Sequence, residues 1–392
     1  MKIEVFFEPE IFFTRRVDKI DGTFRFDDFL KLLDEVNSSK SDDDSDQNQR
    51  KFIVTKDSSV FQNNHICVIR LSDFVGYKSF VFERMDLYLD IFERMGVEKL
   101  LINNPTRILM SNLENQSGLL VHNINSFKKI NINKINSLSE KLDQQIIGQE
   151  KAKLAIYRKL IIQHIRTGNK PLVLMFYGNP GIGKTEVAKL MASTLFKTKT
   201  ILREQMSMTA GNASIEYFKA TGHTENSFSK ELLNRKSNIL LLDEFALAPE
   251  YIQTAFFQLF DEGKYIDQNF SVDMRNSIII CTSNFTSKKQ MKKSISPALY
   301  SRFDAVIPFV DFTLEEKLEV SDKIIENYVK SGKMKSQYIE LIDIYKVKDR
   351  VHQMVKTLSN FRSIRNLVED IIADELIKIS EFKRSEEHTS EL

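Results

Sequence analysis

The sequence predicts an α/β protein with a parallel sheet, and three apolar runs are the basis of this prediction. Each run has the composition of a strand that is buried on both faces of a sheet. Leu172–Tyr177 leads into a glycine-rich turn, Ile239–Leu242 into two acidic residues, and Ile278–Cys281 into small polar residues. Because the carboxyl ends of parallel strands lie at one edge of a sheet, we expect these endings to meet there.

The glycine-rich turn has the pattern G-x-x-x-x-G-K-T and stands between the first strand and a helical pattern over Glu186–Phe196. Glycines let the backbone curl so that successive N–H groups point inward, and the following helix N-terminus adds partial positive charge. Lys184 can reach the outer phosphates of a nucleotide, and the Thr185 hydroxyl can bind Mg²⁺. The turn therefore predicts a nucleoside triphosphate site formed by Gly178, Asn179, Pro180, Gly181, Ile182, Gly183, Lys184 and Thr185.

Polar side chains follow the other two strands. Asp243 can bind Mg²⁺ together with Thr185, and Glu244 can orient and deprotonate a water molecule. Asn284, after the third strand, can donate a hydrogen bond to that water or to the terminal phosphate. A strand that simply ends in solvated acids is the alternative, and the preceding phosphate-binding turn argues against it. These residues predict the hydrolysis of ATP, with Mg²⁺ as the cofactor.

Composition excludes several classes of protein. The 392 residues suffice for two or three domains, and a formal net charge of +2 predicts neither nucleic acid nor a membrane as partner. Cys67 and Cys281 lack the spacing of a metal site, so a reducing cytosol is the simplest compartment. No apolar run has membrane-spanning length, and acidic residues near the N-terminus argue against a signal peptide. We therefore expect a cytoplasmic protein.

Residues 1–120 are expected to form a small α+β N-terminal domain of unassigned role. Alternation and helical spacing predict strands over Met1–Phe13, Lys51–Thr55 and His65–Leu71, and helices over Phe26–Val36 and Phe82–Met95. The acidic stretch Asn37–Arg50 is expected to be a disordered loop.

Residues 121–137 have isolated apolar positions, which are typical of a linker or of an exposed helix. The pattern Ser137–Glu140 then predicts a capping box at the start of a helix. A long amphipathic helix is expected to follow, ending at about Arg166.

In its ordered motifs the chain resembles an AAA+ ATPase, and more narrowly the ATPase module of the Clp family of unfoldases. The resemblance spans residues 138–382 and implies a large α/β nucleotide-binding domain over 138–312 with a helical lid over 313–383. Thr313–Glu316 has the pattern of a capping box at the start of the lid. The stretches that carry the resemblance are Ile146–Gln149, Leu241–Phe245, Phe257–Asp267, Arg275–Asn284, Ser296–Asp304 and Asn360–Arg365.

The resemblance also implies roles for individual residues. Ile146 and Ile147 would pack against adenine, and Arg362 would lie over the phosphates in its own subunit. Arg302 would enter the site of a neighbouring subunit as an arginine finger, a role that suits a planar and permanently charged guanidinium. A surface salt bridge between Arg302 and Asp304 is the alternative. Because such a finger requires a ring, the resemblance implies a homohexamer that acts on a protein partner. Residues 1–120 lie outside the resemblance and are a candidate recognition domain for that partner.

One departure concerns the loop that grips polypeptide in the family. Its nearest counterpart, Gly222–Glu225, has no aromatic residue beside the glycine, and the spacing of Tyr217 and Phe218 predicts a packed helix, with Phe228 also a core candidate. Two alternatives to a protein-remodelling motor stay open, and the missing aromatic residue favours the first. One is an ATP-controlled interaction scaffold, for example in a bacterial defence system, and the other is a nucleic-acid remodelling ATPase. The basic run Lys288–Lys293 lacks interleaved aromatic residues, which favours a solvated loop.

The last nine residues, Arg384–Leu392, resemble one translated reading frame of a widely used DNA-sequencing adapter. We expect them to be an artefact of sequence assembly, so that the native sequence beyond Lys383 is unknown. They therefore carry no functional argument.

Overall fold

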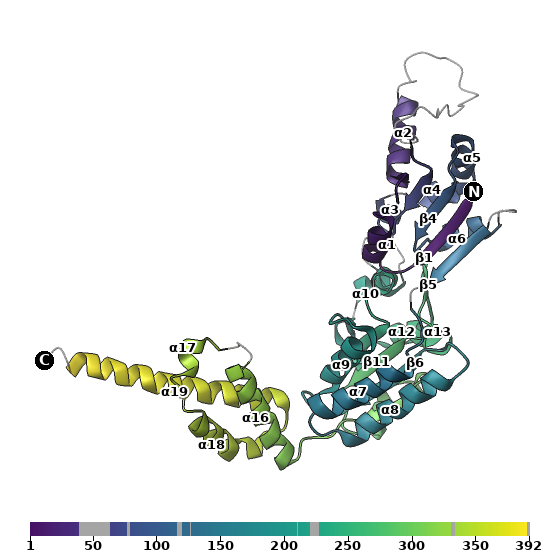
Figure 1. Ribbon diagram of the computed structural model, residues 1–392. Helices are drawn as coiled ribbons and strands as arrows, with labels where there is room; N and C mark the ends of the chain where they lie inside the picture. The colour runs from purple at the N-terminus through teal and green to yellow at the C-terminus, as the bar shows by residue number, and fades with distance from the viewer. Residues whose placement is uncertain are drawn as a thin grey trace.

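The computed structural model describes residues 1–38, 63–76, 79–115, 120–125, 127–209, 211–219, 227–330 and 334–389. Within these ranges the chain forms an N-terminal sheet with its helices, a second sheet with its helices, and a C-terminal group of helices (Figure 1).

The N-terminal sheet has the strand order β2-β3-β4-β1-β5, and every pair of neighbouring strands is parallel. In the register of the central strand, Lys2 lies opposite both Lys99 and Leu120. The strands are β1 (Lys2–Phe7), β2 (Thr23–Arg25), β3 (Ile66–Ile69), β4 (Lys99–Asn103) and β5 (Leu120–Asn125). The helices are α1 (Glu10–Val17), α2 (Phe26–Ser38), α3 (Asp73–Gly76), α4 (Ser79–Glu83), α5 (Met85–Met95) and α6 (Arg107–Asn115).

The α+β prediction for this part of the chain is therefore wrong, because the described strands form a parallel α/β sheet. Parallel strands need a crossover connection, and helices supply it between successive strands here. The strand that we predicted over Met1–Phe13 ends at Phe7, and Pro9 precedes the first helix. The predicted strand Lys51–Thr55 and most of the acidic stretch lie outside the described residues.

The predicted linker over residues 121–137 is also wrong, because this stretch contains most of strand β5, which pairs with β1. The alternative, a helix, is confirmed only at the end of the stretch, where α7 (Ile132–Gln145) begins. Asn131 caps this helix, since its side chain accepts a hydrogen bond from the backbone N–H of Lys134 at 3.0 Å. The capping box predicted at Ser137 therefore lies inside a helix that has already begun.

The second sheet has the strand order β12-β6-β11-β8-β7, again with parallel neighbours throughout, as the sequence predicts. Its strands are β6 (Leu172–Tyr177), β7 (Leu202–Gln205), β8 (Ile239–Asp243), β11 (Ile278–Ser283) and β12 (Ala305–Pro308); β9 (Lys264–Ile266) and β10 (Ser271–Asp273) form an antiparallel hairpin. The helices are α8 (Glu150–Ile165), α9 (Lys184–Phe196), α10 (Asn212–Lys219), α11 (Phe228–Leu233), α12 (Glu250–Gln253), α13 (Phe257–Glu262), α14 (Lys288–Ser294) and α15 (Pro297–Tyr300), with 3-10 turns at Met206–Met208, Phe245–Leu247 and Thr254–Phe256.

Alternate residues of the central strands enter two different cores, as the period of a strand requires. On one face, Leu174 and Leu241 pack with residues of α7, α8 and α9. On the other face, Met175 and Leu242 pack in the same cluster as buried residues of the N-terminal sheet. Hydrogen bonds also join the two parts, since the backbone N–H of Arg107 donates to the carbonyl of Asn269 at 2.8 Å. The N-terminal part of the chain thus contacts the part around the second sheet.

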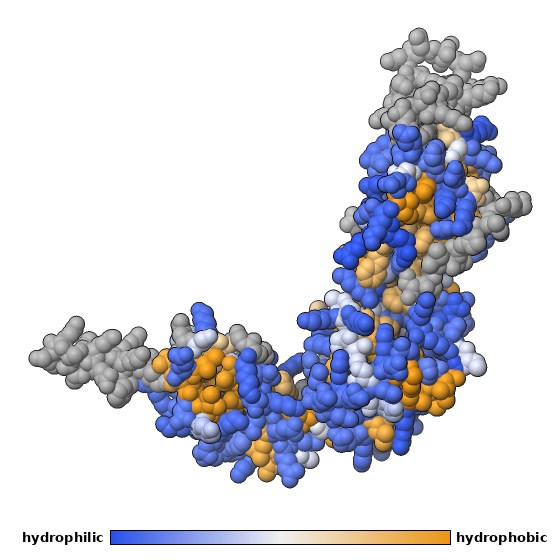
Figure 2. All heavy atoms as spheres, in the orientation of Figure 1, coloured by the Kyte–Doolittle hydropathy of each residue, from blue (hydrophilic) through white to orange (hydrophobic). Residues whose placement is uncertain are grey.

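Helix α8 differs from the amphipathic helix that we predicted. Its inward side is buried, but Leu154, Ile162 and Ile165 on its outer side are 47%, 52% and 64% exposed. Their spacing places all three on one face of the helix. Figure 2 shows exposed apolar side chains in separate groups, on the lid and on the part of the chain around the second sheet.

The C-terminal helices form a lid with its own core of buried aliphatic residues. Thr313 and Glu316 form the predicted capping box, with backbone N–H to side-chain oxygen distances of 2.8 and 3.2 Å. No helix in the described part of the chain is both long enough and apolar enough to cross a membrane. The lid helices are α16 (Leu314–Lys330), α17 (Ser336–Ile339), α18 (Ile344–Met354) and α19 (Phe361–Thr389), with a 3-10 turn at Val355–Thr357.

Candidate functional site

The three strand endings predicted to meet do lie at one edge of the second sheet. Strand β11 lies between β6 and β8, with Ile278 opposite both Leu172 and Ile239. The glycine-rich turn, the acidic pair and Asn284 therefore follow neighbouring parallel strands. This edge is where open α/β sheets bind ligands.

The phosphate-loop segment Gly178–Gly183 depends on backbone shapes that glycine permits. Gly178 has a φ of 142°, and a Cβ atom there would lie 2.3 Å from the carbonyl oxygen of Phe309. Gly183 has a φ of 103°, in the region that other residues rarely adopt. The loop leads directly into α9 at Lys184. The sequence thus folds into a tight bend at a helix N-terminus, as anion binding requires.

Lys184 is buried under this bend, with only 7% of its surface exposed. Its Nζ donates hydrogen bonds to the carbonyl oxygens of Gly178 at 2.5 Å and Asn179 at 2.8 Å, and to Oδ1 of Asn284 at 3.1 Å. Burial lowers the pKa of Lys184 to about 8, although the nearby carboxylates of Asp243 and Glu244 oppose this shift. The ammonium of Lys184 is thus buried and bound by neutral carbonyl oxygens, and phosphate oxygens could take the place of these carbonyls as its hydrogen-bond acceptors.

Asp243 ends strand β8 and is paired on both carboxylate oxygens. Oδ1 accepts a hydrogen bond from the Thr282 hydroxyl, and Oδ2 accepts from Nε of Arg203 at 3.0 Å and from the Nη2 of the same guanidinium. Thr282 also accepts a hydrogen bond from the backbone N–H of Glu244 at 2.9 Å. One hydroxyl therefore binds both members of the acidic pair and fixes them relative to β11.

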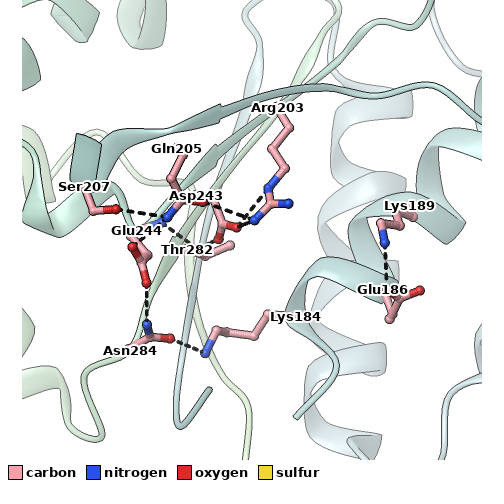
Figure 3. Close-up of polar contacts among 10 residues, drawn as sticks. All are labelled: Lys184, Glu186, Lys189, Arg203, Gln205, Ser207, Asp243, Glu244, Thr282 and Asn284. Atoms are coloured by element: carbon pink, nitrogen blue, oxygen red, sulfur yellow. Dashed lines mark hydrogen bonds and ion pairs between the residues drawn. The ribbon is translucent and has the colours of Figure 1, made fainter. Parts of the chain in front are cut away.

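The Glu244 carboxylate receives one hydrogen bond on each oxygen (Figure 3). Nδ2 of Asn284 donates to Oε1 at 3.0 Å, and Nε2 of Gln205 donates to Oε2 at 2.6 Å. Since Asn284 also accepts from Lys184, it connects the lysine of the phosphate loop with the carboxylate of the acidic pair. The arrangement brings a phosphate-binding cation and a candidate base to one place.

The side chains at this edge suit magnesium. Thr185 and Asp243 offer a hydroxyl and a carboxylate, the hard oxygen donors that Mg²⁺ prefers, and Mg²⁺ commonly completes its shell with water and phosphate. Among the residues that the structure describes, no group of three or more His, Cys, Asp or Glu side chains is placed to hold a metal. A nucleotide would therefore have to supply part of the coordination shell.

Two known families match the part of the chain that contains this site. The family described as AAA domain (Cdc48 subfamily) matches residues 169–338, which include the phosphate loop, the acidic pair and Asn284. Residues 169–338 are an AAA+ ATPase domain. A second family, Torsin, matches residues 121–214.

The relatives of this chain include Clp proteins. The chaperone protein ClpB of Malacoplasma penetrans is 27% identical over 271 residues, which are 62% of this chain and 38% of that protein. Two ClpL proteins of Staphylococcus aureus, named as ATP-binding subunits of an ATP-dependent Clp protease, are 26% and 28% identical over 58% and 50% of this chain. They are covered over 38% and 31% of their own length. The chain thus resembles the Clp ATPase module but spans less than half of these relatives.

The isoleucine pair lies at the junction of the AAA+ domain and the lid. Ile146 packs against the core around α7, α8 and α9, whereas Ile147 packs against the core of the lid. The adjacent Gln149 exchanges two hydrogen bonds with the backbone of Val310, at 2.7 and 3.0 Å. This amide fixes the segment that enters the lid, so both isoleucines lie where the two cores meet.

The lid also contacts the phosphate loop of the AAA+ domain directly. The backbone N–H of Phe361, at the start of α19, donates to the carbonyl of Gly181 at 2.8 Å. Asn360 caps this helix by accepting a hydrogen bond from the N–H of Ser363 at 3.0 Å. Arg362 is exposed next to this contact and has no hydrogen bond or ion pair within the described part of the chain.

Arg302 does not join the other site residues of the same AAA+ domain. Its Nε donates to Oδ2 of Asp261 at 2.7 Å. The salt bridge with Asp304 that we considered is wrong, because Asp304 accepts a hydrogen bond from the backbone N–H of Val173 at 2.8 Å. Arg302 is thus held by α13, and the Asp304 carboxylate anchors the end of the arginine segment to β6.

Two other predictions near the AAA+ site concern packing. Phe218 and Phe228 are buried, and the Tyr217 hydroxyl donates to Glu204 at 2.9 Å, so the packing predicted for these aromatic residues is confirmed. The counterpart of the polypeptide-gripping loop, residues 222–225, lies outside the described residues.

The basic run Lys288–Lys293 forms helix α14 instead of the solvated loop that we expected. Buried Met291 anchors one side of this helix, while the lysines stay exposed.

Three side chains of the AAA+ site were missed from the sequence: Arg203, Gln205 and Thr282. Arg203 and Gln205 alternate along β7, so both point to one face, and Gln205 lies opposite Asp243 in the register. In the sequence, Arg203 and Gln205 are only two polar residues at alternate positions of a short strand. This pattern belongs to no known motif and did not mark them as site residues. Thr282 precedes Asn284 by two positions, and its place at the end of a buried strand could have marked it.

Proposed function

We propose that this chain hydrolyses ATP with Mg²⁺ and uses the energy to remodel a protein partner, as a motor or switch of the Clp-like branch. The observation that carries the proposal is the position of Asn284 between Lys184 and Glu244, at 3.1 and 3.0 Å. A phosphate-binding cation and a general base must lie this close to act on one phosphoryl group and one water.

In this proposal the phosphate loop and Lys184 bind the triphosphate through backbone N–H groups and the buried ammonium. Thr185 and Asp243 would hold Mg²⁺, which neutralises charge on the phosphate oxygens when it is bound. Thr282 and Arg203 fix the orientation of the Asp243 carboxylate, since both donate hydrogen bonds to it.

Glu244 would accept the proton of the attacking water. Its carboxylate is oriented by Asn284 and Gln205, which bind one oxygen each and leave further lone pairs for the water. Asn284 would orient the water or the terminal phosphate from the neighbouring strand.

The lid would respond to the nucleotide. Ile146 and Ile147 would pack against adenine at the junction of the two cores, and Arg362 would reach the phosphates from the start of α19. The contact between Phe361 and Gly181 supports this coupling, because any rotation of α19 must move or break a hydrogen bond to the phosphate loop.

A homohexameric ring is part of the proposal. Arg302 is held away from the site of its own chain, as a residue serving a neighbour must be. The outer side of α8 exposes Leu154, Ile162 and Ile165, and a row of exposed apolar side chains typically marks a protein-binding surface. The printed names of the relatives, a chaperone and protease ATP-binding subunits, favour a protein as the substrate.

The test combines two measurements on the full chain. Release of phosphate from ATP is measured together with loss of fluorescence from a folded fluorescent protein that carries an unstructured tag. We expect ATP hydrolysis that the tagged protein stimulates, with unfolding that depends on ATP. Absence of hydrolysis at any concentration of chain and Mg²⁺ would refute the proposal.

The second candidate function is an ATP-controlled interaction scaffold. It is favoured by the packing of Tyr217, Phe218 and Phe228, which leaves none of these aromatic side chains available to grip a polypeptide. In this case the N-terminal sheet would recognise a dedicated partner, and the tagged protein would stimulate hydrolysis without being unfolded. Capture of partners on the Glu244→Gln variant, held in its ATP-bound form, would identify that protein.

A further inference from the structure

The guanidinium of Arg302 is restrained on three sides by its own chain. Nε donates to Oδ2 of Asp261 at 2.7 Å, and Nη1 donates to the carbonyl of Ala298 at 2.6 Å. The guanidinium carbon lies 4.5 Å from the ring centre of Phe257, within the range of a cation–π contact. Within the described part of the chain Nη2 has no partner, so this nitrogen remains able to bind another group.

Two of these restraints come from one short helix, α13. Phe257 and Asp261 are four positions apart and therefore lie on the same face of the helix. The same helix is anchored by Leu259 and Phe260, both of which are fully buried. The ring of Phe257 and the carboxylate of Asp261 thus belong to a helix that is fixed by its buried side chains, and their contacts with Arg302 restrain the guanidinium.

We propose that Asp261 and Phe257 are positioning residues, which hold the Arg302 guanidinium ready for the nucleotide of a neighbouring copy of this chain. The inference rests on the proposed function, in which Arg302 acts on the phosphates of the neighbour. A free arginine loses much rotamer freedom when it binds phosphate, and a side chain that is already restrained loses less. Its plane is also set in advance, which matters because the guanidinium binds oxygens as a planar fork.

A purely structural role for the ion pair is a poor explanation of this geometry. The Asp261 side chain is 42% exposed, and exposed ion pairs contribute little to the free energy of unfolding. Its loss should therefore change the orientation of Arg302 while leaving the fold intact. A positioning role of Asp261 therefore predicts a loss of kcat without a loss of stability, whereas a structural role predicts a loss of stability.

The test uses the full chain with Asp261→Asn and Phe257→Leu, and with Glu262→Gln as the matched control. Glu262 is the next residue on α13, and among the described residues its side chain pairs only with the Gln258 amide, at 3.2 Å. We expect Asp261→Asn to lower kcat about tenfold, with KM and the melting temperature near wild type, because a small misplacement of a catalytic group costs this much or more. Phe257→Leu should show the same pattern, and Glu262→Gln should match wild type.

A double variant separates action through Arg302 from any other effect. If Asp261 acts only through Arg302, then Asp261→Asn in an Arg302→Ala background should cause no further loss of kcat. The inference is wrong if Asp261→Asn leaves kcat unchanged or raises it, or if it lowers kcat equally in both backgrounds. If Arg302→Ala itself retains full activity, the failure lies in the proposed role of Arg302. Should Asp261→Asn fail to fold, Phe257→Leu decides by the same criteria.

Discussion

Asn284 donates a hydrogen bond across 3.0 Å to Glu244, a residue forty positions earlier in the chain. The two residues follow neighbouring parallel strands, β11 and β8, and the same asparagine accepts a hydrogen bond from Lys184. This one side chain therefore connects Lys184 with the candidate base Glu244 through two hydrogen bonds. The predictions below test the parts of this arrangement separately.

Glu244→Gln should abolish turnover while ATP still binds. The amide cannot take a proton from water, so kcat should fall by at least about 100-fold. The phosphate loop is unchanged, and the affinity for a fluorescent ATP analogue should stay near wild type. Phosphate release and equilibrium binding measure the two quantities. Normal hydrolysis by this variant would show that another group is the base.

The affinity of the wild-type chain for ATP should fall as the pH rises above 8. Burial lowers the pKa of Lys184 to about 8, so above this pH the unbound site increasingly holds a neutral amine. Binding of phosphate requires the ammonium, and the dissociation constant should rise by up to about tenfold per pH unit. Lys184→Arg remains charged and should give a flat profile between pH 8 and 9.5, whereas Lys184→Ala should bind weakly throughout.

The same shift predicts a change in stability with a definite sign. Between pH 8 and about 10.5 the unfolded chain binds more protons at Lys184 than the folded chain does. The contribution of this residue to the free energy of unfolding should therefore increase with pH across this window and be constant below it. Urea denaturation of wild type and Lys184→Met at pH 7.5 and 9.5 would detect the difference, and equal pH dependence in both would contradict it.

Gly178→Ala should destabilise the chain more than Gly96→Ala does. Both glycines have positive φ, 142° and 83°, but only at residue 178 would the new Cβ meet backbone, the carbonyl of Phe309 at 2.3 Å. We expect losses of about 3 kcal/mol at residue 178 and about 1 kcal/mol at residue 96 in the free energy of unfolding. Similar midpoints of urea denaturation for the two variants would mean that the loop tolerates the methyl group.

Arg362→Ala should reduce ATP hydrolysis without affecting the fold. The side chain is exposed, and within the described residues it has no partner to lose. If it binds phosphate in the closed state, its removal should lower kcat by about 100-fold with no change in melting temperature. Arg365→Ala is the control, since it removes only a surface ion pair with Glu369 at 3.3 Å. Equal rates for both variants would remove Arg362 from the site.

Local patterns predicted the parts of this protein that local chemistry decides. The phosphate loop follows from glycines that permit one backbone path and from a helix that starts at Lys184. The capping box of Thr313 and Glu316 follows from two side chains three positions apart. The parallel orientation of the strands in the second sheet follows from a sequence in which apolar strands alternate with helices.

The pairing of the N-terminal strands and the start of helix α7 were not predicted correctly, because both depend on contacts between distant segments. The N-terminal strands are short, and their spacing alone does not distinguish a parallel sheet from an α+β arrangement. The reason is that a long connection between two strands is compatible with either a parallel or an antiparallel pair. Asn131 replaced Ser137 as the helix cap because the apolar positions Ile135, Leu138 and Leu142 pack on α8 and α9, which extends the helix toward its N-terminus. Packing decided where the helix begins.

The sequence by itself predicted a phosphate-binding turn at Gly178–Thr185, and an acidic pair and an asparagine that follow two further apolar strands. Only the tertiary structure decided the partners of these groups: Gln205 for Glu244, Arg203 for Asp243, and Asp261 for Arg302. The reason is physical. A turn or a helix cap is closed by residues within a few positions of one another, whereas strand order and register result from packing of the whole core and are not written in any short segment.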